Sequence, residues 1–208
     1  MSLLLNVPVA EEATAKARGV LWDTHVQSWY LPDINYDRLM EVDSWIADKD
    51  NAIILPDEIM IAHTTTLCRH CNHASPVIAI GSDYFFVKEM NERDEPVWLE
   101  QDFFTLFEQT ATLSDNLRLL LQENYPHYKP GHSGTTYWNN HCTHCNNPLD
   151  DRLLFEEAGS AFHPESQEAA AAISLKLFQF KYAPRIDAGY TTGPYLRLIT
   201  EFAARNMK

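Results

Sequence analysis

The sequence predicts an α+β protein with a small N-terminal module, residues 1–48, and a larger domain, residues 57–208. Two observations favour this class. Runs that alternate in β fashion are mixed with capped segments of helical period, and turns join several runs of the larger domain, which predicts a mostly antiparallel sheet with flanking helices. The chain also has 208 residues of which 45% are hydrophobic, enough to build a real core.

The N-terminal module is predicted to have the order βαββα. Its elements are expected, in chain order, at residues 3–9, 10–18, 20–22, 26–31 and 36–46. Gly19 suits the end of the first helix, and Asn35 can cap the second. Trp22, Trp29 and Tyr30 could form a stacking platform for a base or a peptide. We favour a core role for them, because so small a module needs large side chains to fill its interior.

The larger domain is expected to follow a linker, residues 47–56, that runs into a short strand. Further strands are predicted at residues 59–66, 76–80, 84–88, 97–99, 103–107, 135–138 and 173–182. A helix is the alternative for the fifth of these. Helices are predicted at residues 115–124, where Ser114 is the cap, and 193–205, where Pro194 lies in the first turn, and also at 165–172. A loop is expected at 128–134 and a short strand or helical turn at 152–155.

Every cysteine of the chain lies in one of two knuckles, Cys68-Arg69-His70-Cys71 and Cys142-Thr143-His144-Cys145. Structural zinc takes four ligands in a tetrahedron, and one Cys-x-x-Cys turn supplies half of them. Two knuckles of the same spacing, with no cysteine left over, predict that one structural Zn²⁺ is bound by Cys68, Cys71, Cys142 and Cys145. Because predicted strands flank the knuckles, the larger domain is expected to be zinc-ribbon-like. The 70 residues between Cys71 and Cys142 must then be folded structure.

Two other interpretations of the cysteines remain open. They could be buried free thiols, since Cys packs as a small hydrophobic residue. They could also be redox-active pairs of the thioredoxin spacing. That motif usually opens a helix, whereas Cys71 is followed by a turn, residues 72–76, and then by an apolar run, residues 77–80. We therefore favour zinc over both.

Histidines crowd the predicted metal site, and any of four could replace a thiolate in a mixed centre: His70, His73, His141 and His144. We favour four thiolates, with the histidines and Arg69 offsetting the negative charge of a tetrathiolate zinc. A filled coordination shell has no open position for water, and catalytic zinc needs one. The motif therefore predicts a structural metal.

Other candidate catalytic residues are weak. Gly131-His132-Ser133-Gly134 superficially resembles a nucleophile elbow, but it lacks the second glycine at the required offset and follows no clear strand. Asp150-Asp151 and Glu156-Glu157 are expected to be solvated carboxylates, because nothing in the sequence pairs them with a metal or an acid–base partner. No catalytic residue is predicted.

Two segments carry a family resemblance. Residues 5–32, with Leu5-Asn6-Val7-Pro8, Trp22-Asp23 and Trp29-Tyr30-Leu31-Pro32, resemble a short uncharacterised domain of bacterial plasmid and mobile-element proteins, often associated with primases. Residues 125–147, with Tyr137-Trp138 and Asn140 through Cys145, resemble a zinc-binding segment of uncharacterised bacterial proteins. The first resemblance implies a link to nucleic-acid processing, and the second implies metal binding.

Charge and targeting signals limit the function. A formal net charge of −13 opposes loose binding to nucleic acid or to anionic membranes. We expect no targeting segment and no membrane span. Cysteines confined to two knuckles favour a reducing cytoplasm. The leading hypothesis is a non-enzymatic cytoplasmic zinc-binding protein that contacts another protein. The alternatives are a nucleic-acid-associated accessory protein of a mobile element and a metal-dependent hydrolase with a mixed Cys/His zinc.

Overall fold

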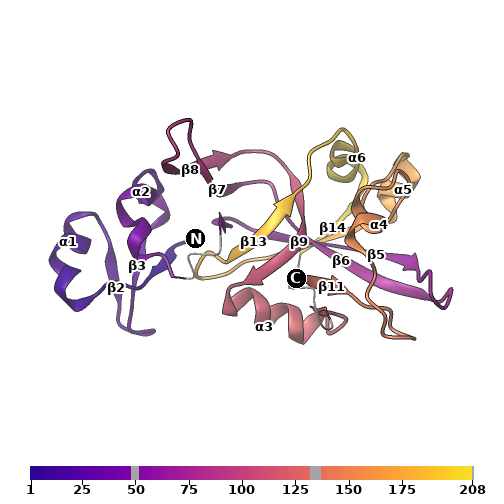
Figure 1. Cartoon of the computed structure of the whole chain (residues 1–208), viewed down its shortest axis with the longest axis horizontal. Helices are drawn as coiled ribbons and strands as arrows, with labels where there is room; N and C mark the ends of the chain where they lie inside the picture. The colour runs from indigo at the N-terminus through magenta and orange to yellow at the C-terminus, as the bar shows by residue number, and fades with distance from the viewer. Residues whose placement is uncertain (48–51, 132–136, 208) are drawn as a thin grey trace.

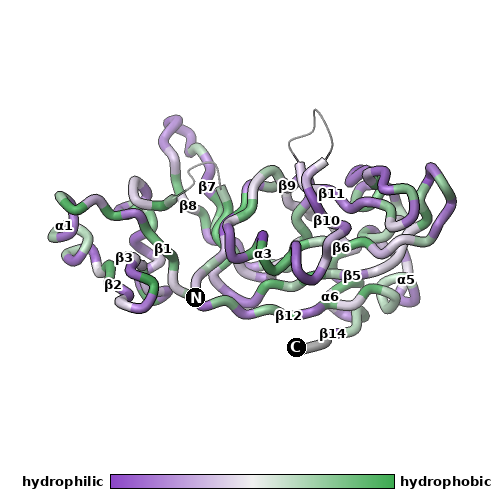
Figure 2. Tube along the Cα trace, turned by 90° about the horizontal axis from the view of Figure 1, so that it is seen from below, coloured by the Kyte–Doolittle hydropathy of each residue, from purple (hydrophilic) through white to green (hydrophobic). Residues whose placement is uncertain are grey.

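The computed structural model describes residues 1–47, 52–131 and 137–207, and it has the predicted α+β class with mostly antiparallel sheets. Figure 1 shows an elongated molecule with the N-terminal module at one end and the helices that follow the second knuckle near the other. In Figure 2 the strand centres are hydrophobic, whereas the tip between β7 and β8 is hydrophilic. No described helix has the length and apolar character needed to cross a membrane.

A large sheet forms the centre of the part of the chain that the structure describes. Its strand order is β14-β12-β5-β6-β9-β13-β4-β7-β8, and only the β12–β14 pair is parallel. The strands are β4 (Ile53–Ile54), β5 (Ile59–Leu67), β6 (Ala74–Ser82), β7 (Phe85–Met90), β8 (Pro96–Gln101), β9 (Thr105–Leu113), β12 (Ser174–Phe178), β13 (Arg185–Tyr190) and β14 (Ala204–Met207).

Alternation along β5 and β6 gives the sheet two buried faces. Ile59 and Ile61 face one core, together with α3 (Asp115–Asn124) and the hairpin of β10 (Tyr128–Pro130) and β11 (Trp138–Asn140). Met60 and Ala62 face the other core, together with Cys68, Cys142, α4 (Asp151–Phe155) and α6 (Tyr195–Phe202). The short helix α5 (Gln167–Ala171) packs on α6. The two knuckles therefore belong to the second core.

The N-terminal module contains a three-stranded sheet of order β1-β3-β2, formed by β1 (Leu3–Leu5), β2 (Leu21–Asp23) and β3 (Ser28–Leu31). The first helical segment, η1 (Val9–Glu11) with α1 (Glu12–Ala17), ends at Gly19, whose φ of +80° confirms the predicted glycine stop. Trp29 is 7% exposed, as a core residue should be, whereas Trp22 is 46% exposed and packs edge-on against it.

The second predicted helix of the module, residues 36–46, is wrong as a continuous element. The chain instead forms η2 (Asp33–Arg38), α2 (Leu39–Val42) and η3 (Asp43–Trp45). Asn35 does not cap them. It lies inside η2 in a non-helical conformation, and its side-chain amide donates a hydrogen bond of 3.1 Å to the carbonyl of Gly19. A Cβ at Gly19 would come within 2.6 Å of that amide. Glycine is therefore needed here both for the positive φ and for the space that the Asn35 side chain occupies.

The module packs on the β4–β7–β8 end of the large sheet. Ile54, Phe86 and Ala183 share a core with its buried residues, and Asp43 accepts hydrogen bonds from Lys88 and from the Trp98 indole. The predicted linker contributes β4, which lies between β13 and β7. Independent folding of residues 1–48 and 57–208 therefore stays a prediction.

Three further differences concern the larger domain. Residues 128–130, predicted as loop, form β10. Of the predicted strand 135–138, residues 135–136 lie outside the described residues, and Trp138 is the first residue of β11. No element was predicted over residues 185–190, because Asp187 and Gly189 interrupt the apolar pattern there. The structure nevertheless has β13 at these residues, inside the large sheet. Residues 84–88 do form a strand, but β7 does not pair with β6, so the turn between them closes no hairpin.

Residues 152–155 are helical.

Candidate metal centre

The two knuckles have the same local structure. In the first, Cys68 N donates to the His73 carbonyl at 2.9 Å and Asn72 N to the Cys68 carbonyl at 2.7 Å. In the second, the corresponding bonds run from Cys142 N to Asn147 and from Asn146 N to Cys142, both at 2.9 Å. Each turn closes on an asparagine with positive φ, 57° at Asn72 and 59° at Asn146. Asparagine tolerates this left-handed conformation better than most residues, which explains its place after each Cys-x-x-Cys.

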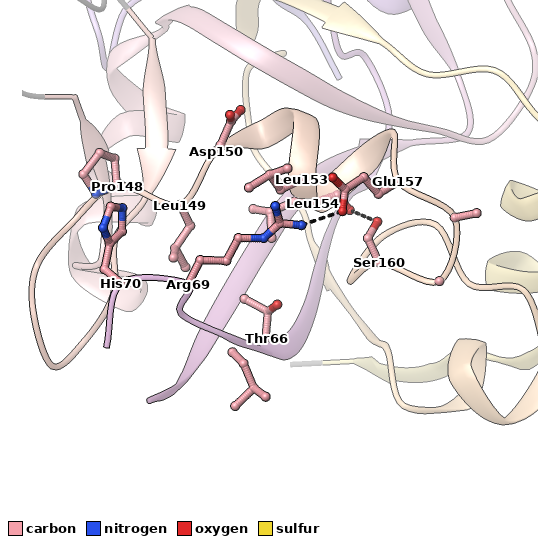
Figure 3. A pocket seen from close by; sticks show the side chains of 13 residues that line it. Thr66, Arg69, His70, Pro148, Leu149, Asp150, Leu153, Leu154, Glu157 and Ser160 are labelled. Carbon is pink, nitrogen blue, oxygen red and sulfur yellow. Dashed lines mark hydrogen bonds and ion pairs between the residues drawn. The ribbon is translucent and has the colours of Figure 1, made fainter. Parts of the chain in front are cut away.

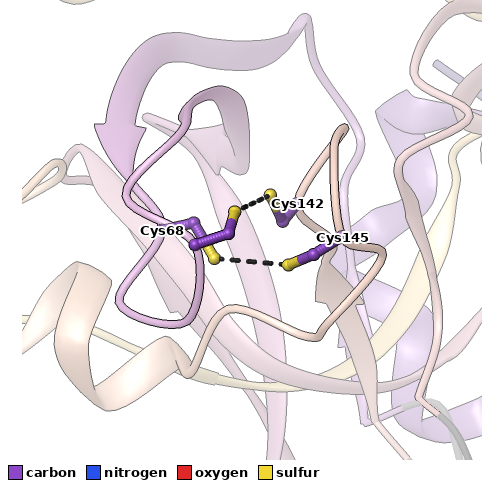
Figure 4. A group of neighbouring side chains, drawn as sticks. Cys68, Cys142 and Cys145 are labelled. Carbon is purple, nitrogen blue, oxygen red and sulfur yellow. Dashed lines mark hydrogen bonds between the residues drawn. The ribbon is translucent and has the colours of Figure 1, made fainter.

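The turns bring four sulfurs together. All four Sγ atoms lie within 4.8 Å of one another, and the arrangement could hold a metal ion. Cys68 Sγ lies 3.7 Å from Cys145 Sγ, and Cys71 Sγ lies 3.6 Å from Cys142 Sγ, so both contacts join different knuckles (Figure 4). Four thiolates around a tetrahedral zinc with bonds of about 2.3 Å stand about 3.8 Å apart. The observed spacing fits that geometry, and the cysteines form no disulfide.

Hydrogen bonds to sulfur favour thiolates at the second knuckle. Cys142 Sγ accepts from the Ser75 hydroxyl at 3.2 Å and from His144 N at 3.4 Å. Burial opposes ionisation of Cys142, but these donors and the backbone of Cys145 outweigh it and lower the pKa of that thiol.

The opposite shift occurs at Cys71. The backbone of His73 lowers its pKa, but burial and the three other sulfurs outweigh that hydrogen bond and raise it. Four thiols this close cannot all ionise without a cation, and a bound divalent metal removes that repulsion.

The neighbouring histidines lie outside the group of potential ligand atoms found among the described residues. His73 and His144 are exposed and stack on each other, with ring centroids 5.0 Å apart. His141 is buried, and its Nδ1 lies 3.0 Å from the Asn139 carbonyl. Arg69 forms an ion pair of 2.6 Å with Glu157, so a carboxylate already matches its charge. These contacts favour a tetrathiolate over a mixed Cys/His centre.

A cavity of about 490 Å³ lies between the first knuckle and α4 (Figure 3). Arg69 and His70 line it from the knuckle side, and Leu149, Leu153 and Leu154 line it from the α4 side. The Arg69–Glu157 ion pair spans it. This cavity was not predicted from the sequence. The only sequence pattern that could have indicated it is the spacing of Leu149, Leu153 and Leu154, and the same spacing also suits an ordinary helix that packs on a core.

The acidic pairs near α4 divide into two kinds. Asp150, Glu156 and Glu157 are exposed, and Asp150 caps α4 by accepting a hydrogen bond of 3.0 Å from Arg152 N. The prediction that Asp151 is solvated is wrong: it is 8% exposed and accepts a hydrogen bond of 2.8 Å from Gln109 N. Helix α4 turns its first residue toward β9, which a sequence pattern of two adjacent aspartates does not reveal. Ser133, which is not expected to be a nucleophile, lies outside the described residues.

Comparisons with protein-family models, with curated proteins and with solved structures found no match. The resemblances to a mobile-element domain and to a bacterial zinc-binding segment therefore stay predictions, and the site must be interpreted from its own chemistry.

Proposed function

We propose that this is a non-enzymatic cytoplasmic protein that binds one structural zinc ion through Cys68, Cys71, Cys142 and Cys145 and recognises a protein partner. The observation that carries the proposal is the position of the cavity, which has the first knuckle as one wall. Metal binding would fix that wall, because the free energy of binding structural zinc is part of the free energy of folding.

The cavity has the chemistry of a peptide site rather than of a nucleic-acid site. Leu149, Leu153 and Leu154 offer an apolar surface for one or two apolar side chains of a partner. Arg69 and Glu157 offer both charges at the rim, which suits a polar peptide backbone or a charged flanking residue. Nucleic acid would need unpaired cations, and the net charge of −13 opposes it. A filled tetrathiolate shell also opposes hydrolysis at the metal.

The metal part of the proposal is tested on untagged protein. We expect one zinc per chain by elemental analysis and four thiols that become reactive only after chelation. Cobalt substitution should give the spectrum of a tetrathiolate centre. A spectrum with nitrogen ligands would revive the hydrolase, and two disulfides without metal would overturn the zinc centre.

The partner part is tested by affinity capture from the source cell with nuclease-treated extract. We expect a protein partner that binds the wild type and is lost with Leu153→Asp, a half-buried position in the cavity wall. The matched control is Leu119→Asp, which places the same charge on the exposed side of α3. Equal capture by wild type and Leu153→Asp would overturn the assignment to this cavity. Capture that disappears on nuclease treatment would instead favour the nucleic-acid accessory role.

A further inference from the structure

A second set of buried polar atoms lies where β9, β10 and α4 meet. We call it the buried oxygen cluster, and it consists of Glu108, Thr110, Tyr128 and Asp151. Thr110 is fully buried, Asp151 is 8% exposed and Tyr128 is 6% exposed. Burial and then the charge of Asp151 raise the pKa of Tyr128, and a side-chain hydrogen bond with Thr110 lowers it, so these three side chains are neighbours.

Irregular backbone in β9 builds the cluster. Glu108 pairs with Gly189 and Thr112 with Asp187, so three residues of β9 stand opposite one residue of β13. Gln109 lies in this bulge with a φ of 50°, a strained conformation for its residue type. The bulge frees the Gln109 N–H from the ladder, and it donates to Asp151 Oδ2 at 2.8 Å.

Two carboxylate oxygens of the cluster, Glu108 Oε2 and Asp151 Oδ1, are buried and have no hydrogen-bond partner among the described residues. A buried polar atom without a partner destabilises the fold, because it has lost its hydration without gaining a hydrogen bond, and a charged atom does so more strongly. Most buried polar atoms in native proteins have a partner, either a protein group or a bound water, and an exception needs an explanation such as an ion. Two such oxygens on neighbouring carboxyl groups therefore indicate a ligand.

The cluster is also short of positive charge. None of the ion pairs found among the described residues includes Glu108 or Asp151. Burial raises the pKa of Asp151 to about 6, and the charges of Glu108 and Asp150 add to that rise against the Gln109 hydrogen bond. Burial and then the charge of Glu156 raise the pKa of Glu108. Two carboxyl groups that repel each other in a buried site need a shared proton or a cation.

We propose that Glu108, Thr110 and Asp151, with the Tyr128 hydroxyl beside them, form a binding site for a divalent cation that prefers oxygen ligands, Mg²⁺ or Ca²⁺. Every donor is an oxygen, which suits these hard cations and not the metal of the thiolate centre. Two carboxylates match the charge of a divalent ion, and water completes its coordination. This site is separate from the sulfur cluster and does not depend on the proposed partner.

The first test is titration of the zinc-loaded full-length protein with Tb³⁺, a luminescent substitute for hard cations. Tyr128 and Trp138, whose ring centroids are 5.9 Å apart, are placed to sensitise it. We expect emission that saturates at one equivalent and is displaced by excess Ca²⁺ or Mg²⁺. Emission that fails to saturate at one equivalent, or that Ca²⁺ and Mg²⁺ at millimolar concentration do not displace, would overturn the proposal.

Variants locate the ion. Asp151→Asn and Glu108→Gln should each weaken Tb³⁺ binding by more than about tenfold, since losing even an outer-shell partner of a metal ligand has effects of that size. The matched control Asp83→Asn removes the same charge at an exposed position outside the cluster, and it should bind as the wild type does. Circular dichroism and zinc content identify any variant that fails to fold. Equal binding by folded Asp151→Asn and wild type would mean that surface carboxylates hold the ion and that the buried pair shares only a proton.

Discussion

The sulfur cluster and the buried oxygen cluster both gather polar atoms away from water, but the chain assembles them differently. The sulfurs come from two copies of one short turn, and each turn also supplies its own asparagine for the left-handed position. The oxygens come from single residues on β9, β10 and α4, and a bulge in β9 brings them together. A local sequence motif predicts the first site, whereas only the tertiary structure reveals the second.

The clusters also differ in the metal they suit and in what the fold does without it. Sulfur donors select zinc or a similar soft metal, whereas carboxylates and hydroxyls select Mg²⁺ or Ca²⁺. The sulfur centre joins segments 70 residues apart, so its loss opens the second core. The oxygen cluster lies against β9, a strand inside the large sheet that is also held by its pairing with β6 and β13. We therefore expect large effects on folding at the first site and smaller effects, with a change of sign, at the second.

The largest effect is expected for Cys142→Ser. Removing this ligand should abolish stoichiometric zinc and destabilise the fold by more than about 5 kcal/mol, since structural zinc contributes about 10–16 kcal/mol in zinc-finger peptides. Thermal melting and elemental analysis measure both quantities. Thr143→Ser, an exposed change inside the same knuckle, is the control and should keep its metal. A Cys142→Ser protein with unchanged melting temperature and zinc content would contradict a shared site.

The second prediction concerns Asp151→Asn, and its sign depends on the cation. The pKa of Asp151 rises from 3.8 to about 6 on folding, so the folded protein binds this proton more tightly than the unfolded chain does. The resulting stabilisation is complete below about pH 4 and is lost as the pH rises to about 6. At pH 7 without a hard cation, Asp151→Asn should therefore be more stable than the wild type, by roughly 3 kcal/mol.

Saturating Ca²⁺ or Mg²⁺ should shrink or reverse that difference, because a cation stabilises only the protein that binds it. Denaturant unfolding of zinc-loaded wild type and variant, with and without each cation, measures both arms. A variant that is less stable than the wild type at pH 7 in metal-free buffer would show that the carboxylate has a partner the structure does not reveal.

Much of this could be predicted from the sequence where the physical cause is local. The clustering of the four cysteines follows from residue spacing, and the Gly19 stop follows from its tolerance of positive φ. The elements that could not be predicted depend on distant partners. Strand β13 is short and contains Asp187 and Gly189, so its own pattern is weak, and it exists because β9 and β4 flank it. Asp151 is an ordinary helix start in sequence, and only the bulge at Gln109 gives it a buried partner.

The third prediction compares the strained residues of the two sites. Asn72 and Gln109 both have positive φ, but asparagine suits that conformation and glutamine does not. Gln109→Gly should stabilise the fold by about 1 kcal/mol by relieving strain, while its backbone N–H still binds Asp151. Asn72→Gly should change stability by less than that. Equal gains at both positions in denaturant unfolding would mean that the bulge stores no more strain than the knuckle turn.

The smallest effect on stability is expected at the rim of the cavity, where Arg69→Gln breaks the ion pair with Glu157. Both side chains are about half exposed, so the pair should contribute less than about 1 kcal/mol. Zinc content should not change either, because Arg69 bonds to Glu157 and lies outside the group of potential metal ligands. Partner capture should nevertheless weaken, since the cavity loses one of its two rim charges. A large fall in melting temperature together with loss of zinc would show that Arg69 supports the metal centre itself. That result would contradict the assignment of Arg69 to the partner surface alone.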